Sequence, residues 1–337
     1  MAGRKACPTY LILTCFLERN SFPPIPLSLL DQASTRLSSG FRVPTFLRNF
    51  FWYSAMPAAF VRSWLVACCL LFTSGCAGIN RLQYSPLAGL EHGILYQPSK
   101  FPEGNWRPAG LKFEDASFSA EDGTKLHGWY VPHDKPRGIA LFAHGNAGNV
   151  SDCADALRIL HDKHQLTVLA FDYRGYGRSA GAPTEAGLYE DARAARKWLA
   201  RRAGIQEADI ILLGYSLGGG VMIDLAAKDG ARGLVLTSTF TSLGDVGKLH
   251  FPVLHHLMYQ EFDSLSKIAQ YHGPLLYSHG DKDDLIPFEQ GEKLFAAANE
   301  PKRFVVNHSG QHNSPQSAEY RKVFDEFLTS LPPVKPR

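Results

Sequence analysis

Ile211-Leu-Leu-Gly-Tyr-Ser-Leu-Gly-Gly-Gly220 is the stretch that decides the fold of this 337-residue chain. It begins as an apolar strand and continues as a helix, with Gly214-Tyr-Ser-Leu-Gly218 at the junction. Such a sharp turn needs glycine on both sides of the serine, because a β-carbon would clash there, and it lifts the hydroxyl to the carboxyl edge of a sheet. We therefore predict that Ser216 is a nucleophile. A glycine-rich turn without chemistry is the competing interpretation.

The same turn predicts a site for an anion. Leu217 opens the helix, so its N–H points outward, and the positive end of the helix dipole favours an anionic tetrahedral intermediate. Leu217 N–H is thus one predicted oxyanion donor. A second donor should come from the loop after the strand Gly138–Ala143, which reads His144-Gly-Asn-Ala-Gly-Asn149.

Short apolar runs alternate with helical stretches on both sides of Ser216, and this alternation predicts an α/β fold with a doubly wound, mostly parallel sheet. The Glu121-Asp-Gly-Thr124 turn predicts an antiparallel N-terminal hairpin at one edge. Predicted strands cover Phe113–Ala120, Lys125–Val131, Gly138–Ala143, Leu166–Phe171, Ile210–Leu213, Gly233–Leu236, Pro274–Ser278 and Arg303–Val306. Predicted helices cover Asp152–His164, Leu188–Ala203, Leu217–Lys228, Glu289–Ala298 and Ala318–Leu328.

Composition excludes several classes of protein. With 45% hydrophobic and 20% charged residues, the chain is globular rather than disordered or fibrous. Residues 1–75 hold seven Lys/Arg and two Asp/Glu, which leaves 28 basic and 30 acidic residues and a net charge of −2 for the remainder. That balance gives no electrostatic reason to expect nucleic acid as a partner. The Cys and His spacings suggest no metal site, and we expect no cofactor.

Four motifs resemble those of α/β-hydrolases: the His144–Asn149 loop, Asp172-Tyr-Arg-Gly-Tyr-Gly-Arg-Ser179, the Ser216 turn and His279-Gly-Asp-Lys-Asp283. The resemblance covers roughly residues 110–330. It is strongest to the lid-poor branch that holds the α/β-hydrolase-domain palmitoyl-protein thioesterases and their bacterial relatives. The resemblance implies Asn146, with Ala147 as the alternative, as the second oxyanion amide. In this fold His144 normally shapes the oxyanion loop, although a direct role is the alternative.

The remaining catalytic residues must follow Ser216, because this fold presents its triad in the order serine, acid, histidine. Asp281, Asp283 and Asp284 all satisfy that order. The family pattern His-Gly-x-x-Asp-x-x-Ile-Pro implies Asp283. A glycine and one further residue precede the catalytic histidine in the family, which implies His312 rather than His308.

These residues predict a serine hydrolase that cleaves a carboxylic ester or thioester through an acyl-enzyme. A serine aminopeptidase-like peptidase is the enzymatic alternative, since such enzymes share the fold and the triad. A non-catalytic envelope lipoprotein that keeps the fold for binding is the alternative from another class. The oligomeric state has no signature in the sequence.

The only insertion of note, Thr239–Tyr271, is too short for a large cap, so we expect an open site. Its apolar stretch makes Phe251, Leu254 and Met258 candidate substrate-pocket residues. A core-packing helix is the competing interpretation.

The leader predicts export. After Arg62 comes an apolar stretch, residues 64–72, and then Thr73-Ser-Gly-Cys76, which is typical of a signal peptide and too short to span a membrane. Cys76 resembles the acylated cysteine of the bacterial lipobox, although Thr73 stands where that motif has leucine. Ordinary secretion, an uncleaved anchor and a buried apolar segment are the alternatives.

The predicted organisation has four parts. Residues 1–55 are a mis-assigned start or disordered, residues 56–75 are a lipoprotein-type signal peptide, residues 76–110 are a tether and strap, and residues 111–330 are the hydrolase domain. We expect a protein of the bacterial cell envelope, bound to the membrane through a lipid on Cys76. A secreted or periplasmic protein is the alternative.

Overall fold

The computed structural model describes residues 93–250 and 260–334 of the chain. The leader with Cys76 and the predicted pocket residues Phe251, Leu254 and Met258 lie outside the described residues. In the described part, no helix is both long enough and apolar enough to cross a membrane.

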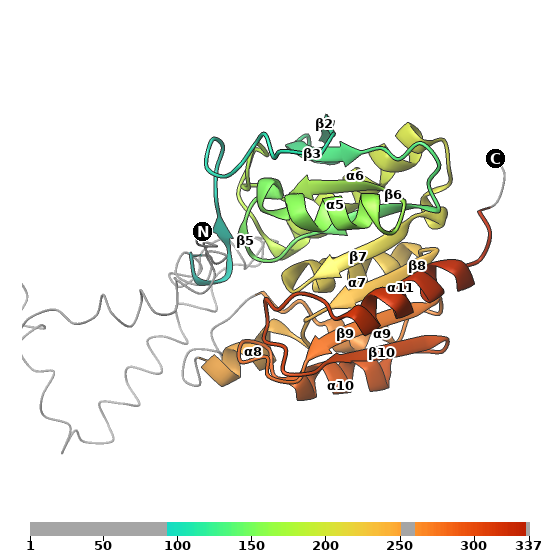
Figure 1. Ribbon diagram of the computed structural model, residues 1–337. Helices are drawn as coiled ribbons and strands as arrows, with labels where there is room; N and C mark the ends of the chain where they lie inside the picture. Colours follow the sequence, from blue (N-terminus) through green and yellow to red (C-terminus); the bar gives the residue numbers. More distant parts are fainter. Residues whose placement is uncertain (1–92, 251–259, 335–337) are drawn as a thin grey trace, which may run out of the picture. The chain divides into compact units, whose positions relative to one another are not determined.

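The core is an eight-stranded sheet in the order β10-β9-β8-β7-β4-β6-β3-β2 (Figure 1). The strands from β4 to β10 in this sheet pair in parallel, and β3 pairs antiparallel with both β2 and β6. The predicted mostly parallel sheet with an antiparallel hairpin at its edge is therefore confirmed. The strands are β2 (Glu114–Ser119), β3 (Lys125–Val131), β4 (Gly138–Ala143), β6 (Leu166–Asp172), β7 (Ile211–Tyr215), β8 (Gly233–Thr237), β9 (Leu275–Gly280) and β10 (Lys302–Asn307).

Helices cover both faces of this sheet, and each face has its own hydrophobic cluster. One cluster takes buried residues from α6, α7, α9 and α10, and the other takes them from α5 and α11. Figure 1 shows α5 and α11 together on the near face. The helices are α5 (Ala154–Asp162), α6 (Glu185–Ala203), α7 (Leu217–Asp229), α8 (Leu243–His250), α9 (Ser264–Ile268), α10 (Phe288–Ala297) and α11 (Ala318–Ser330).

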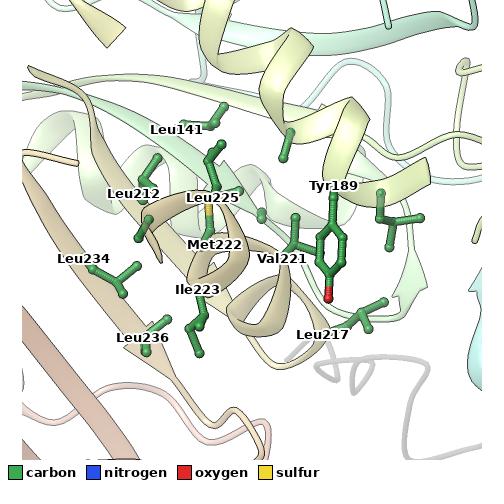
Figure 2. Packing of buried hydrophobic residues seen from close by; sticks show 14 of the residues in the cluster. Leu141, Tyr189, Leu212, Leu217, Val221, Met222, Ile223, Leu225, Leu234 and Leu236 are labelled. Atoms are coloured by element: carbon green, nitrogen blue, oxygen red, sulfur yellow. The ribbon is translucent and has the colours of Figure 1, made fainter. Parts of the chain in front are cut away.

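The helix that follows Ser216 is the most deeply buried of these. Its residues Val221, Met222 and Ile223 have no exposed surface. Figure 2 shows the side chains of α7 between leucines of the sheet, such as Leu212, and Tyr189 of α6. Burying side chains of this size is worth about 1.5–3 kcal/mol each, so α7 is fixed against the sheet and gives Ser216 a rigid support.

Two helix starts differ from the prediction, and a side-chain cap lies at each: α6 begins earlier than Leu188, and a 3₁₀ turn precedes α5, which begins at Ala154 rather than at Asp152. Thr184 accepts a hydrogen bond from Gly187 N, so α6 starts at Glu185 rather than at Leu188. Asn149 accepts one from Ser151 N and opens a short 3₁₀ turn, Val150–Cys153, ahead of α5. Each cap satisfies an amide that has no partner within its helix.

The topology fixes where a site can form. From β4 the chain runs outward to β6 and then returns to add β7 on the other side of β4. In open parallel sheets, ligands bind beyond the carboxyl ends of the strands at such a switch point. Here it lies between the loop after β4 and the turn after β7.

Candidate active site

Ser216 occupies a tight turn between β7 and α7, as its glycine neighbours predict. Its backbone has φ 52° and ψ −118°, a combination that residues with a β-carbon rarely adopt. A β-carbon at Gly218 would lie 2.1 Å from the carbonyl oxygen of Ala143, at the end of β4. Glycine at this position therefore lets the turn after β7 lie directly against β4.

The structure brings together the three residues predicted to form the triad. The Oγ of Ser216 lies 3.0 Å from Nε2 of His312, and Nδ1 of His312 lies 2.8 Å from Oδ2 of Asp283. Because a carboxylate can only accept, Nδ1 carries the hydrogen and Nε2 accepts from the serine hydroxyl. All three residues are buried, each with 6% of its surface exposed.

Asp283 lies in a setting that keeps it ionised. Its Oδ1 accepts hydrogen bonds from Leu285 N and Ile286 N. Burial acts to raise the pKa of Asp283, but hydrogen bonds from His279 and His312 outweigh it and hold that pKa well below its usual range. The carboxylate is thus negatively charged at neutral pH and can stabilise a positive charge on His312.

The loop that carries His312 is held in place from two sides. The hydroxyl of Tyr215 donates to His312 O at 3.1 Å and also contacts Asn313 Oδ1. A β-carbon at Gly280 would lie 2.2 Å from Gly310 O, so glycine there lets the two loops touch. The end of β9 and the His312 loop therefore meet backbone to backbone.

His144 lies beneath the predicted oxyanion loop and fixes its shape. Its Nδ1 is 2.8 Å from the carbonyl oxygen of Gly145, which can only accept, so Nδ1 is protonated. Burial lowers the pKa of His144, although the charge of Asp172 opposes this, and the ring is therefore neutral. Because a peptide unit is planar, fixing Gly145 C=O also fixes the direction of Asn146 N–H.

A segment far away in sequence holds the same loop from the other side. β1 (Gln97–Pro98) pairs in parallel with β5 (Ala147–Gly148), which lies inside the loop. Gln97 N donates to Asn146 O at 2.9 Å, and the Tyr176 hydroxyl donates to the same oxygen at 2.7 Å. Sequence reasoning missed this contact, because a two-residue strand ending in proline has no recognisable signal.

The competing candidates are placed elsewhere. His308 and Asp281 form their own pair, with Nδ1 and Oδ2 3.1 Å apart, and His308 is exposed. Asp284 is exposed as well.

The predicted oxyanion donor Leu217 is the first residue of α7, so its N–H belongs to the amides at the helix start that have no acceptor within the helix.

Known proteins resemble this chain over most of its described length. A family model described as serine aminopeptidase, S33, matches residues 134–266. The uncharacterized protein Rv2307c of Mycobacterium tuberculosis is 40% identical over 246 residues, which are 70% of this chain and 86% of that protein. The α/β-hydrolase domain-containing protein WAV2 of Arabidopsis thaliana is 30% identical over 282 residues, 76% of this chain and 89% of that protein.

Solved structures share the fold. The esterase Pf2001 of Pyrococcus furiosus matches with a TM-score of 0.59. The matched region is 70% of this chain and 98% of the esterase chain. Its sequence identity is 22%, so the likeness is one of fold.

Proposed function

Because this chain belongs to the α/β-hydrolase family, we propose that it is a serine hydrolase that cleaves a carboxylic ester or thioester through an acyl-enzyme on Ser216. The observation that carries the proposal is the unbroken run of hydrogen bonds from Ser216 Oγ through His312 to Asp283. Ser216 itself lies in a strained turn beside the loop after β4. This position supports Ser216 as the nucleophile.

In this reaction His312 removes the proton of Ser216 as Oγ attacks the substrate carbonyl carbon. Asp283 keeps Nδ1 protonated and stabilises the imidazolium that forms. The amides of Leu217 and Asn146 bind the developing oxyanion, and His312 returns its proton to the departing alcohol or thiol. Water, activated by His312, then attacks the acyl-enzyme and releases the acid.

Labelling with a fluorophosphonate probe tests this proposal, together with turnover of p-nitrophenyl esters and acyl thioesters of increasing chain length. Ser216→Ala should abolish labelling, and Ser216→Ala and His312→Ala should each lower kcat by about 10⁴-fold or more. His308→Ala is the matched control, because His308 lies on the same loop but is exposed and pairs with Asp281. Wild-type protein that is folded but neither labelled nor active would contradict the proposal and favour a binding protein.

A peptidase is the second candidate, and the family model described as a serine aminopeptidase favours it. The same assay distinguishes the two when aminoacyl p-nitroanilides are added as substrates. Turnover of esters and thioesters without anilide cleavage is the expected result. A kcat/KM for anilides equal to that for esters would favour the peptidase.

The leader supports a further proposal, that the mature protein is anchored to the bacterial cell envelope by a lipid on Cys76. Cys76→Ser should move the protein from the membrane fraction to the soluble fraction. The change leaves every residue of the described fold untouched, so activity on soluble esters should remain. Unchanged membrane association of the variant would show that Cys76 is not the anchor.

A further inference from the structure

A second histidine contacts the carboxylate of the proposed catalytic acid. His279, at the end of β9, places Nε2 3.3 Å from Asp283 Oδ2, the oxygen that also accepts from His312. The side chain of His279 has no exposed surface. Asp283 Oδ2 therefore lies between two imidazole rings, one belonging to the site and one beneath it.

The protonation of His279 at Nε2 follows from its neighbours. Nε2 is also 2.8 Å from the carbonyl oxygen of Ile286. A backbone carbonyl and an ionised carboxylate are both acceptors, so Nε2 must carry a hydrogen. The two acceptors share that one hydrogen, and the contact with Ile286 O is the shorter. Asp283 thus has two backbone amides on Oδ1 and two imidazole nitrogens that carry hydrogens near Oδ2.

From His279 the contacts continue to the nucleophile without passing through His312. Nδ1 lies 2.9 Å from the hydroxyl oxygen of Tyr277, and that oxygen lies 2.9 Å from Thr239 O. The Oγ1 of Thr239 in turn donates to the backbone carbonyl of Ser216 at 2.8 Å. The buried side chains of His279, Tyr277 and Thr239 therefore connect Asp283 to the turn that carries Ser216.

Packing around the ring leaves it little freedom. A β-carbon at Gly291 of α10 would lie 2.7 Å from Nδ1 of His279. The ring of Phe288, also on α10, stands at 82° to the imidazole with centroids 6.0 Å apart. The imidazole is thus enclosed by α10, and its direction is set by Ile286 and Tyr277.

We propose that His279 is a positioning residue, which holds the Asp283 carboxylate at the distance and angle that His312 requires; this proposal rests on the proposed function. His279 touches neither the substrate nor Ser216 Oγ. Without it, Asp283 Oδ2 loses one of its two donors and can rotate away from His312. The tautomer and direction of the His312 ring, rather than substrate binding, should then suffer.

Two variants of similar size separate this role from simple packing. His279→Gln keeps an N–H donor on a side chain that can extend toward Asp283, and His279→Leu removes it. We expect His279→Leu to lower kcat about 10- to 100-fold, the range found when a residue that orients a metal-ligating histidine is removed. KM should change less than about twofold, and His279→Gln should recover most of kcat. Tyr277→Phe, which keeps the ring and loses one hydroxyl, should give a smaller loss, and it serves as the test if His279→Leu does not fold.

The resonance of the His312 Nδ1 hydrogen provides a readout that needs no turnover. In wild-type protein it should appear far downfield, and in His279→Leu it should shift upfield or broaden. Equal kcat and an unchanged resonance in His279→Leu, or equal losses in the Leu and Gln variants, would overturn the proposal. If wild-type protein proved inactive the proposed function would fail, and the resonance alone would then show whether His279 positions Asp283.

Discussion

The strained backbone at Ser216 predicts that glycine at this position gives a more stable protein than alanine does, while both variants are inactive. The observed φ of 52° and ψ of −118° cost a residue with a β-carbon about 1–3 kcal/mol. Glycine adopts this conformation without that cost. Ser216→Gly and Ser216→Ala both remove the hydroxyl and its contact with His312. Comparing the two variants therefore isolates the backbone.

The expected difference in the free energy of unfolding is about 1 kcal/mol in favour of glycine. Relief of about 2 kcal/mol of strain is offset by about 0.7 kcal/mol, because glycine gains more freedom in the unfolded chain. Lost contacts of the β-carbon remove about a few tenths more. In a domain of this size, 1 kcal/mol raises the melting temperature by about 2–4 °C.

Urea denaturation followed by circular dichroism measures the difference. Ser117 is the control position, because it is exposed in the extended strand β2. There glycine should be less stable than alanine, by about 0.5–1 kcal/mol. If Ser216→Gly were also less stable than Ser216→Ala, the turn would store no strain and the reasoning would fail.

Two further predictions concern the acid and the oxyanion loop. The lowered pKa of Asp283 means that its ionised form stabilises the fold fully above about pH 4, the pKa of an unfolded aspartate, and less as pH falls through the lower folded-state value. Asp283→Asn should therefore lower the free energy of unfolding by about 2 kcal/mol at pH 7. In urea titrations, the difference in free energy of unfolding between the wild type and this variant should shrink below about pH 4. A difference that stayed constant with pH would contradict this. Asn149 Nδ2 donates to Ser99 O and Glu103 O, so Asn149→Ala should loosen this segment, slow fluorophosphonate labelling and increase cleavage by proteases near residue 100. The exposed Asn105→Ala should do neither, and equal labelling rates for all three proteins would show that the segment does not act on the site.

The nucleophile could be predicted from the sequence because its signal is local. Two glycines around a serine, after a strand and before a helix, leave few backbone conformations, and the structure has the strained turn that this requires. Helix starts were less predictable. The apolar periodicity of α6 begins at Leu188, but a side-chain cap at Thr184 adds a turn that carries no apolar residue facing the core.

The acid shows where spacing alone fails. Two aspartate–histidine pairs cross between the same two loops, Asp283 with His312 and Asp281 with His308. Chain order permits either pair. They differ in burial, since Asp283 and His312 are buried and His308 is exposed, and in contact with Ser216, which only His312 makes. Both differences are properties of the folded chain, so in the sequence only the resemblance to known hydrolases favours Asp283 and His312.

The segment around β1 lies within the strap predicted over residues 76–110, but no sequence pattern indicated its contact with the oxyanion loop, which bears on how the site is assembled. Residues 97–103 bind the oxyanion loop about 50 positions further along the chain, through Gln97 N to Asn146 O and Ser99 N to Gly148 O. Backbone hydrogen bonds of this kind depend little on side-chain identity, so no motif marks them. Because Asn146 is held by this segment on one side and by the peptide that His144 fixes on the other, its N–H direction depends on both. Residues 97–103 are therefore part of the framework of the proposed site, and a shortened form of the protein must begin before Gln97 to keep it.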